Sequence, residues 1–190
     1  MTLLILGLVL FLGVHSVRIV ADDWRSMQVA RRGEKTWKLG FTLLSVLGLG
    51  LIVWGYGLAR QQPVLLWPAL PAGVRHLAAL LTLAAFILLA AGQTPGNAIK
   101  AKLQHPMVLG VKLWAFAHLL ANNTLADLVL FGSFLAWAVL DYRAARRRGP
   151  VPVVPVTTAR TVGAVIGGVV AWAVFAFWLH GPLIGVQPFG

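Results

Sequence analysis

The chain contains no cysteine, and only five of its 190 residues are Asp or Glu. The absence of cysteine excludes disulfides, thiolate metal sites, iron–sulfur clusters and a haem attached covalently through a C-x-x-C-H motif. Zinc takes three or four ligands of His, Cys or carboxylate type, so the scarcity of carboxylates also disfavours a zinc site. Any metal centre in this chain must therefore rely mainly on its five histidines.

Charge is also scarce, because charged residues are 11 % of the chain and hydrophobic residues are 59 %. A soluble domain carries roughly a quarter charged residues. Several apolar runs approach the roughly 20 residues that cross a bilayer. The composition predicts an all-α polytopic integral membrane protein, with one domain over residues 1–190 and six transmembrane helices in one bundle. The expected spans are residues 3–20, 37–58, 74–91, 106–122, 125–140 and 162–178.

The connections between these runs differ in character. The first, ADDWRSMQVARRGEKTWK, is polar and predicts a short helix on the membrane surface, whereas the second, RQQPVLLWPALPAGVR, predicts irregular backbone because of its prolines. The last, DYRAARRRGPVPVVPVTTAR, combines an arginine cluster with an extended proline-rich linker. The first apolar run has no basic residue before it, so we expect a retained span rather than a cleaved signal.

The formal charge of +11 would suggest nucleic acid in a soluble protein, but its distribution favours membrane topology and no nucleic-acid partner. The first, third and fifth connections carry thirteen Lys and Arg residues, against two in the second connection and none in the fourth. This alternation is the positive-inside pattern of six spans. It predicts that both termini face away from the cytoplasm, and that the arginine cluster is a topology signal.

Two histidines lie inside predicted spans, where a polar group is costly and usually faces the bundle interior. His15 shares a helix face with Arg18, three residues later. His118 shares a face with Trp114 and Ala115. Two imidazoles from different helices can bind a haem iron axially, so haem b is the cofactor that this inventory supports best.

Three further polar residues should either pair with another polar group or reach the aqueous phase. Lys112 could extend toward the membrane surface, pair with Asp127, or bind an anionic group such as a haem propionate. His105 precedes His118 by thirteen positions, roughly 220° around a helix, so the two should not serve one site. His76 falls near the outer end of the third span.

The residues described so far carry a family resemblance. The segments LFLGVHSVRIV, DDWR and VWGYGLAR, the long block TPGNAIKAKLQHPMVLGVKLWAFAHLLANNTLADLVLFGSFLAWAVLD and the six-span layout resemble NnrU-type membrane proteins. Proteins of this type are named for an association with nitrite and nitric oxide reduction in denitrifying bacteria. The resemblance implies a bacterial inner (plasma) membrane location and a link to nitrogen oxides such as nitric oxide.

The same family is similar to zeta-carotene isomerase, a membrane enzyme with a non-covalent haem b. The matching positions are the HS pair at His15, the HP pair at His105, and W-x-x-x-H from Trp114 to His118. The resemblance implies His15 and His118 as iron ligands. Lys112 or Arg18 would be available to a haem propionate, and Trp114 is a further candidate for contact with the cofactor. The isomerase has a ligand-switching cysteine where this chain has Ala115, which weakens the expectation that a polyene is isomerised here.

The expected positions of the two histidines along their helices bear on whether they can bind the same iron. From the expected span ends, His15 and His118 could be offset by roughly 10 Å along the membrane normal. His76, and after it His105, are therefore kept as reserve ligands.

Two other functions remain open. One is a non-catalytic membrane factor for the assembly or regulation of nitrogen-oxide respiration, in which no single histidine should matter. The other is a relative of membrane methyltransferases of the isoprenylcysteine type, whose RHP motif resembles His105–Pro106. Here Gln104 replaces the arginine, and the chain has no Asp or Glu after Asp141.

Overall fold

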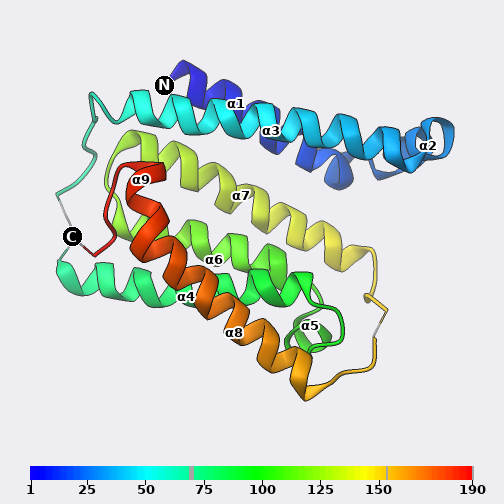
Figure 1. Ribbon diagram of the computed structural model, residues 1–190. Coiled ribbons are helices and arrows are strands. Elements are labelled where there is room, and N and C mark those ends of the chain that lie inside the picture. Colours follow the sequence, from blue (N-terminus) through cyan, green and yellow to red (C-terminus); the bar gives the residue numbers. More distant parts are fainter. Residues whose placement is uncertain (69–70, 153, 190) are drawn as a thin grey trace.

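The computed structural model describes residues 1–68, 71–152 and 154–189, and almost all of its regular structure is helical (Figure 1). Its helices are α1 (Thr2–Val20), α2 (Asp22–Arg32), α3 (Glu34–Ala59), α4 (Ala72–Gln93), α5 (Ala98–Leu103), α6 (Pro106–Ala121), α7 (Leu125–Arg147), α8 (Thr158–Val174), the π-helical turn η1 (Phe175–Leu179) and α9 (His180–Ile184). No strand forms among these residues, apart from an isolated bridge between Leu65 and Thr124.

The six predicted spans are recovered as helices. Five helical segments, beginning at residues 2, 34, 73, 125 and 158, are long and apolar enough to cross a membrane, and α6 is a shorter apolar helix of 16 residues. The prediction of an all-α membrane bundle is confirmed. The first connection forms α2, which buries none of its residues, and described residues 61–68 contain no helix, as expected.

Some span boundaries were wrong. The fifth span was predicted to end at residue 140, but α7 continues to Arg147 because Ala and Arg are strong helix formers even where the apolar run has stopped. The last span begins at Thr158, where the Thr157 side chain caps the helix by accepting a hydrogen bond from the Arg160 backbone N–H. That span ends in η1 and α9, neither of which was predicted.

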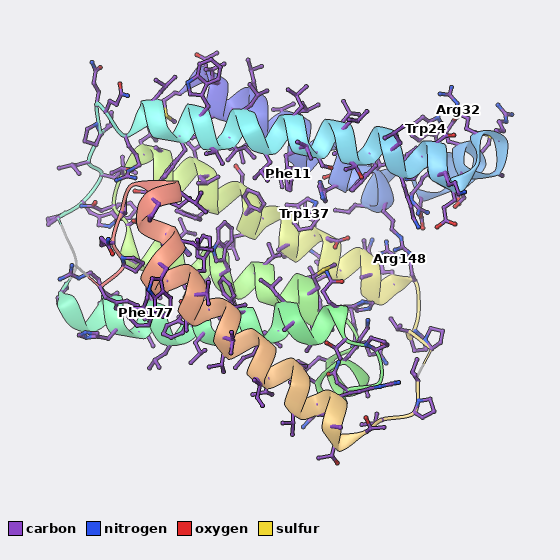
Figure 2. The ribbon with its side chains drawn as sticks, viewed as in Figure 1. Phe11, Trp24, Arg32, Trp137, Arg148 and Phe177 are labelled. Carbon is purple, nitrogen blue, oxygen red and sulfur yellow. The ribbon has the colours of Figure 1, made fainter. Side chains whose placement is uncertain are left out.

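The long helices form two sets: a pair made of α1 and α3, and a group made of α4, α6, α7 and α8. α1 lies along α3, while α6 lies between α4 and α7, and α8 covers α4 (Figure 1). α1 also contacts α7, which joins the pair to the group. At this contact the rings of Phe11 of α1 and Phe134 of α7 lie 5.7 Å apart between centroids. Figure 2 labels Phe11 on α1 and Trp137 on α7.

Glycines allow the closest helix approaches. A Cβ on Gly48 of α3 would lie 2.8 Å from the backbone nitrogen of Phe11, and one on Gly7 would lie 2.6 Å from that of Ile52. Small residues let membrane helices approach and gain van der Waals contact, since lipid provides no hydrophobic drive between helices. The α1–α3 pair therefore depends on glycine at these positions.

The two ends of the bundle differ in charge. The connections that contain α2, α5 and the arginine cluster lie at one end, which we call the basic end (Figure 1). At the other end the second and fourth connections pair, since Leu66 N–H donates to the Asn123 carbonyl at 2.9 Å and Leu125 N–H donates to that of Val64 at 2.8 Å. This grouping is the one that the charge pattern requires; which end faces the cytoplasm stays a prediction.

The α1–α3 contact generates a first prediction. Gly48→Ala should destabilise the folded protein by roughly 1–3 kcal/mol, because the new methyl meets Phe11 backbone that cannot turn away. The matched control is Gly50→Ala, where a Cβ would meet nothing within 4 Å. Thermal unfolding of both variants in detergent should show a lower midpoint for Gly48→Ala alone. Equal midpoints would contradict the glycine-dependent contact.

Candidate functional site

His118 is held by its own helix. Its Nδ1 lies 2.8 Å from the carbonyl oxygen of Trp114, one turn earlier in α6, so Nδ1–H donates to that oxygen. The ring stacks on Phe131 of α7 with centroids 4.5 Å apart. No hydrogen bond reaches Nε2 from the described residues. A ring fixed in this way presents an Nε2 lone pair, the arrangement found in metal-binding histidines.

His15 of α1 repeats the same arrangement. Its Nδ1 lies 2.7 Å from the Phe11 carbonyl oxygen, again one turn earlier. Its ring stacks on Phe11 at 4.2 Å and meets the rings of Phe41 and Trp137 edge-on. The indole N–H of Trp137 is buried without a hydrogen-bond partner in the described part of the chain. The His15 end therefore holds an imidazole with a free Nε2 beside an unsatisfied donor.

A row of rings on α7 separates the two histidines. Phe131, Phe134 and Trp137 follow at three-residue steps, and we call them the aromatic ladder. His118 contacts the ladder at Phe131 and His15 contacts it at Trp137. The two contacted rings are six residues apart, which corresponds to about 9 Å along the axis of α7.

The space between the two imidazoles is occupied by side chains. Trp114 lies 5.5 Å from Phe134, and Phe134 lies 5.7 Å from Phe11, measured between ring centroids. His15 and His118 therefore do not face each other across one metal position in this arrangement. Each imidazole alone has suitable donor chemistry, but the pair does not fit a single iron unless the intervening rings move.

His180 is the histidine that sequence reasoning missed. Its Nδ1 lies 2.7 Å from the Val186 carbonyl oxygen. His180 follows the π-helical turn directly, and such turns are frequent at functional sites. Its position two residues beyond the expected end of the last span was the available signal.

The Asp127 carboxylate accepts hydrogen bonds from neighbouring residues. Asp127 is buried, and the donors to its carboxylate are the Thr124 backbone N–H, the Thr124 hydroxyl and the Tyr56 hydroxyl. The possible Lys112–Asp127 ion pair is therefore wrong: Lys112 is exposed on α6 and forms no ion pair with the described carboxylates. Lys112 and the ladder-facing Trp114 lie on different sides of α6.

The remaining candidates lie apart from His118. Arg18 is exposed near the basic end, with its Nε 3.8 Å from Asp22. His76 is exposed in the second turn of α4. His105 precedes α6 at the opposite end from His118, its Nε2 is buried without a partner among the described residues, and burial, followed by the charge of Arg148, lowers its pKa.

Among residues 1–68, 71–152 and 154–189, no group of three or more His, Cys, Asp or Glu side chains gathers in a way that could hold a metal ion. A haem needs only one or two axial imidazoles.

These features define a class: a multi-pass helical membrane protein whose histidines are fixed by helix carbonyls beside stacked aromatic rings. The family model described as NnrU protein matches residues 3–188. The chain therefore belongs to the NnrU family. No curated protein and no solved structure matches the chain significantly. The resemblance to zeta-carotene isomerase accordingly stays an expectation.

The Asp127 contacts generate a second prediction. Tyr56→Phe removes the hydroxyl that links α3 to Asp127 of α7 and should cost about 1–2 kcal/mol of stability, since the carboxylate loses one of its donors. The other tyrosine, Tyr142, supplies the matched control, because its hydroxyl donates no hydrogen bond in the described structure. Detergent thermal unfolding should separate Tyr56→Phe from Tyr142→Phe. Indistinguishable midpoints would show that the Tyr56–Asp127 bond contributes nothing.

Proposed function

We propose that this NnrU-family protein binds haem b in the membrane, with His118 as an axial ligand. The observation that supports this most is the state of the His118 ring. Its Nδ1–H is held by the Trp114 carbonyl, and its Nε2 is free of hydrogen bonds from the described residues. The ring also stacks against Phe131 in an aromatic surrounding that suits a flat apolar cofactor.

Two histidines compete for the second axial position. The family resemblance implies His15, which has the same Nδ1 arrangement but contacts the ladder six residues away from His118. His180 begins α9, which lies at the same end of the bundle as the C-terminal end of α6 (Figure 1), and its Nδ1 is likewise held by a backbone carbonyl. This placement favours His180. His15 remains the ligand if the rings of Phe11, Phe134 and Trp114 rearrange around the haem.

Absorption spectroscopy tests the ligand set. The detergent-purified chain from haem-supplemented cells should show a Soret band and, after dithionite reduction, resolved α and β bands. His118→Ala should lose most of this haem. His180→Ala should keep haem but change its coordination, which would alter the reduced bands, whereas His15→Ala should leave them unchanged.

The opposite pattern among the variants is equally informative. A change in His15→Ala without a change in His180→Ala would restore the pair implied by the resemblance. The matched control is His76→Ala, an exposed histidine in α4 that should affect nothing. A colourless wild-type protein would refute the haem proposal and leave the non-catalytic assembly or regulatory role.

The chemistry proposed at this site is binding of a small ligand or a polyene. A haem held by His118 would supply an iron coordination position for nitric oxide, or Lewis acidity toward a hydrophobic polyene. The protein's own residues would surround the imidazole with aromatic rings and hold it in one tautomer. Because Ala115 offers no thiol, the ligand switch of the isomerase has no counterpart here, and nitric oxide is the ligand proposed first.

Nitric oxide binding gives a further prediction. Nitric oxide added anaerobically to the reduced protein should shift the Soret band at about one equivalent per haem. His76→Ala should respond like the wild type. An unchanged spectrum in haem-loaded protein would remove nitric oxide from the proposal while leaving haem binding intact.

A further inference from the structure

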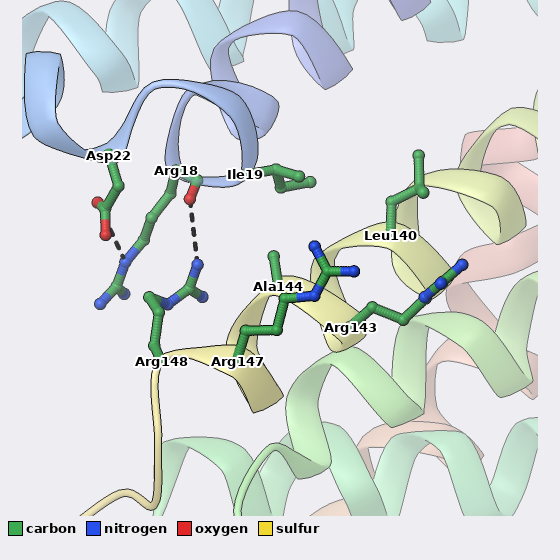
Figure 3. Close-up of a pocket in the computed structure, with 8 residues that line it drawn as sticks. All are labelled: Arg18, Ile19, Asp22, Leu140, Arg143, Ala144, Arg147 and Arg148. Carbon is green, nitrogen blue, oxygen red and sulfur yellow. Dashed lines mark hydrogen bonds and ion pairs between the residues drawn. The ribbon is translucent and has the colours of Figure 1, made fainter.

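A cavity of about 400 Å³ opens between the last turns of α1 and α7 at the basic end (Figure 3). It plays no part in the proposed haem site. Four arginines line it together with one carboxylate and three apolar residues: Arg18, Arg143, Arg147, Arg148, Asp22, Ile19, Leu140 and Ala144.

Two of the four arginines already have partners. Arg18 lies 3.8 Å from Asp22, and Arg148 lies 4.0 Å from Asp141 while also donating to the Arg18 carbonyl at 3.1 Å. The latter bond crosses from α7 to α1, as Figure 3 shows. Arg143 and Arg147 form no ion pair with the described carboxylates. The cavity therefore carries an excess of about two positive charges on its α7 wall.

The apolar lining belongs to the same cavity. Leu140 is 53 % exposed, and it lies at the end of the apolar part of α7, one turn before the arginines. Ile19 lies at the corresponding end of α1. Both helices are candidate membrane spans, and at the cavity their apolar segments give way to charged residues. Such a position is expected at the boundary between the hydrocarbon region and the headgroups. A ligand there meets guanidinium groups and an apolar surface side by side.

We propose that this cavity binds an anionic phospholipid, with its phosphodiester group between Arg143 and Arg147 and an acyl chain along Leu140. Guanidinium groups bind phosphate oxygens in a bidentate manner and are suited to this interface. Basic pockets between transmembrane helices at such a boundary select anionic headgroups. The bound lipid would contact both α1 and α7 beside the Arg148–Arg18 bond and would strengthen their contact.

Native mass spectrometry of the full chain in detergent tests the proposal with defined lipids. Phosphatidylglycerol should form a one-lipid adduct, and phosphatidylcholine of the same acyl chains should bind at least tenfold more weakly. Arg143→Gln/Arg147→Gln should weaken phosphatidylglycerol binding about 10- to 30-fold, the loss expected from two arginine–phosphate attractions. Arg31→Gln/Arg32→Gln removes the same charge from exposed positions of α2 at the same end and should bind like the wild type.

Two further arms separate the alternatives. Inorganic phosphate at millimolar concentration should not displace phosphatidylglycerol; displacement would show a site for soluble phosphate and overturn the lipid proposal. Equal loss of binding in both glutamine pairs would show attraction to net charge only, and would overturn it as well. If the pocket variant does not elute as a folded species, Arg143→Lys/Arg147→Lys provides the comparison, with weaker binding expected because the bidentate contacts are lost.

Haem content provides an independent readout of folding. The Arg143 and Arg147 variants should retain the haem spectrum of the wild type, since neither residue contacts the His118 surroundings. The outcome of the lipid-binding test is therefore independent of the outcome of the haem test.

Discussion

The hydrogen bond from a side chain to the carbonyl oxygen four residues earlier is the interaction on which this bundle depends. Within lipid, a polar group must find its partner inside the protein. His15 and His118 find theirs in this way, and Ser45 and Ser133 use the same bond to Phe41 and Val129. For a serine, this bond uses the only hydrogen that its hydroxyl can donate. For a histidine, it uses the Nδ1–H and leaves Nε2 available to bind a metal or another ligand.

The sequence carried enough information to predict the six spans and the grouping of their connections, because both follow from composition and charge. It also singled out His15 and His118, whose role as iron ligands stays a prediction. It did not reveal that α7 runs past its apolar segment, since helix propensity rather than hydropathy governs Asp141 to Arg147. Nor did it place His180, because a single π-helical turn changes the direction of every side chain after it.

The pairing of Tyr56 with Asp127 shows a different limit. Asp127 looked from the sequence like a possible partner of Lys112, since the two are the only charged residues in that part of the chain. Its carboxylate instead accepts hydrogen bonds from Thr124, which precedes the same helix, and from Tyr56, which lies 71 residues earlier in the chain. Long-range contacts of this kind depend on how α3 crosses α7, which a single sequence does not show.

The π-helical turn at Phe175–Leu179 has a consequence for how this chain can tolerate insertion and deletion. A turn closed by i to i+5 bonds holds one residue more than an α-helical turn, so each residue beyond it is rotated by roughly 100°. Loss of a single codon within these five positions would restore a regular helix and carry the imidazole of His180 to another side. The segment from Phe175 to His180 is therefore constrained in length as well as in composition.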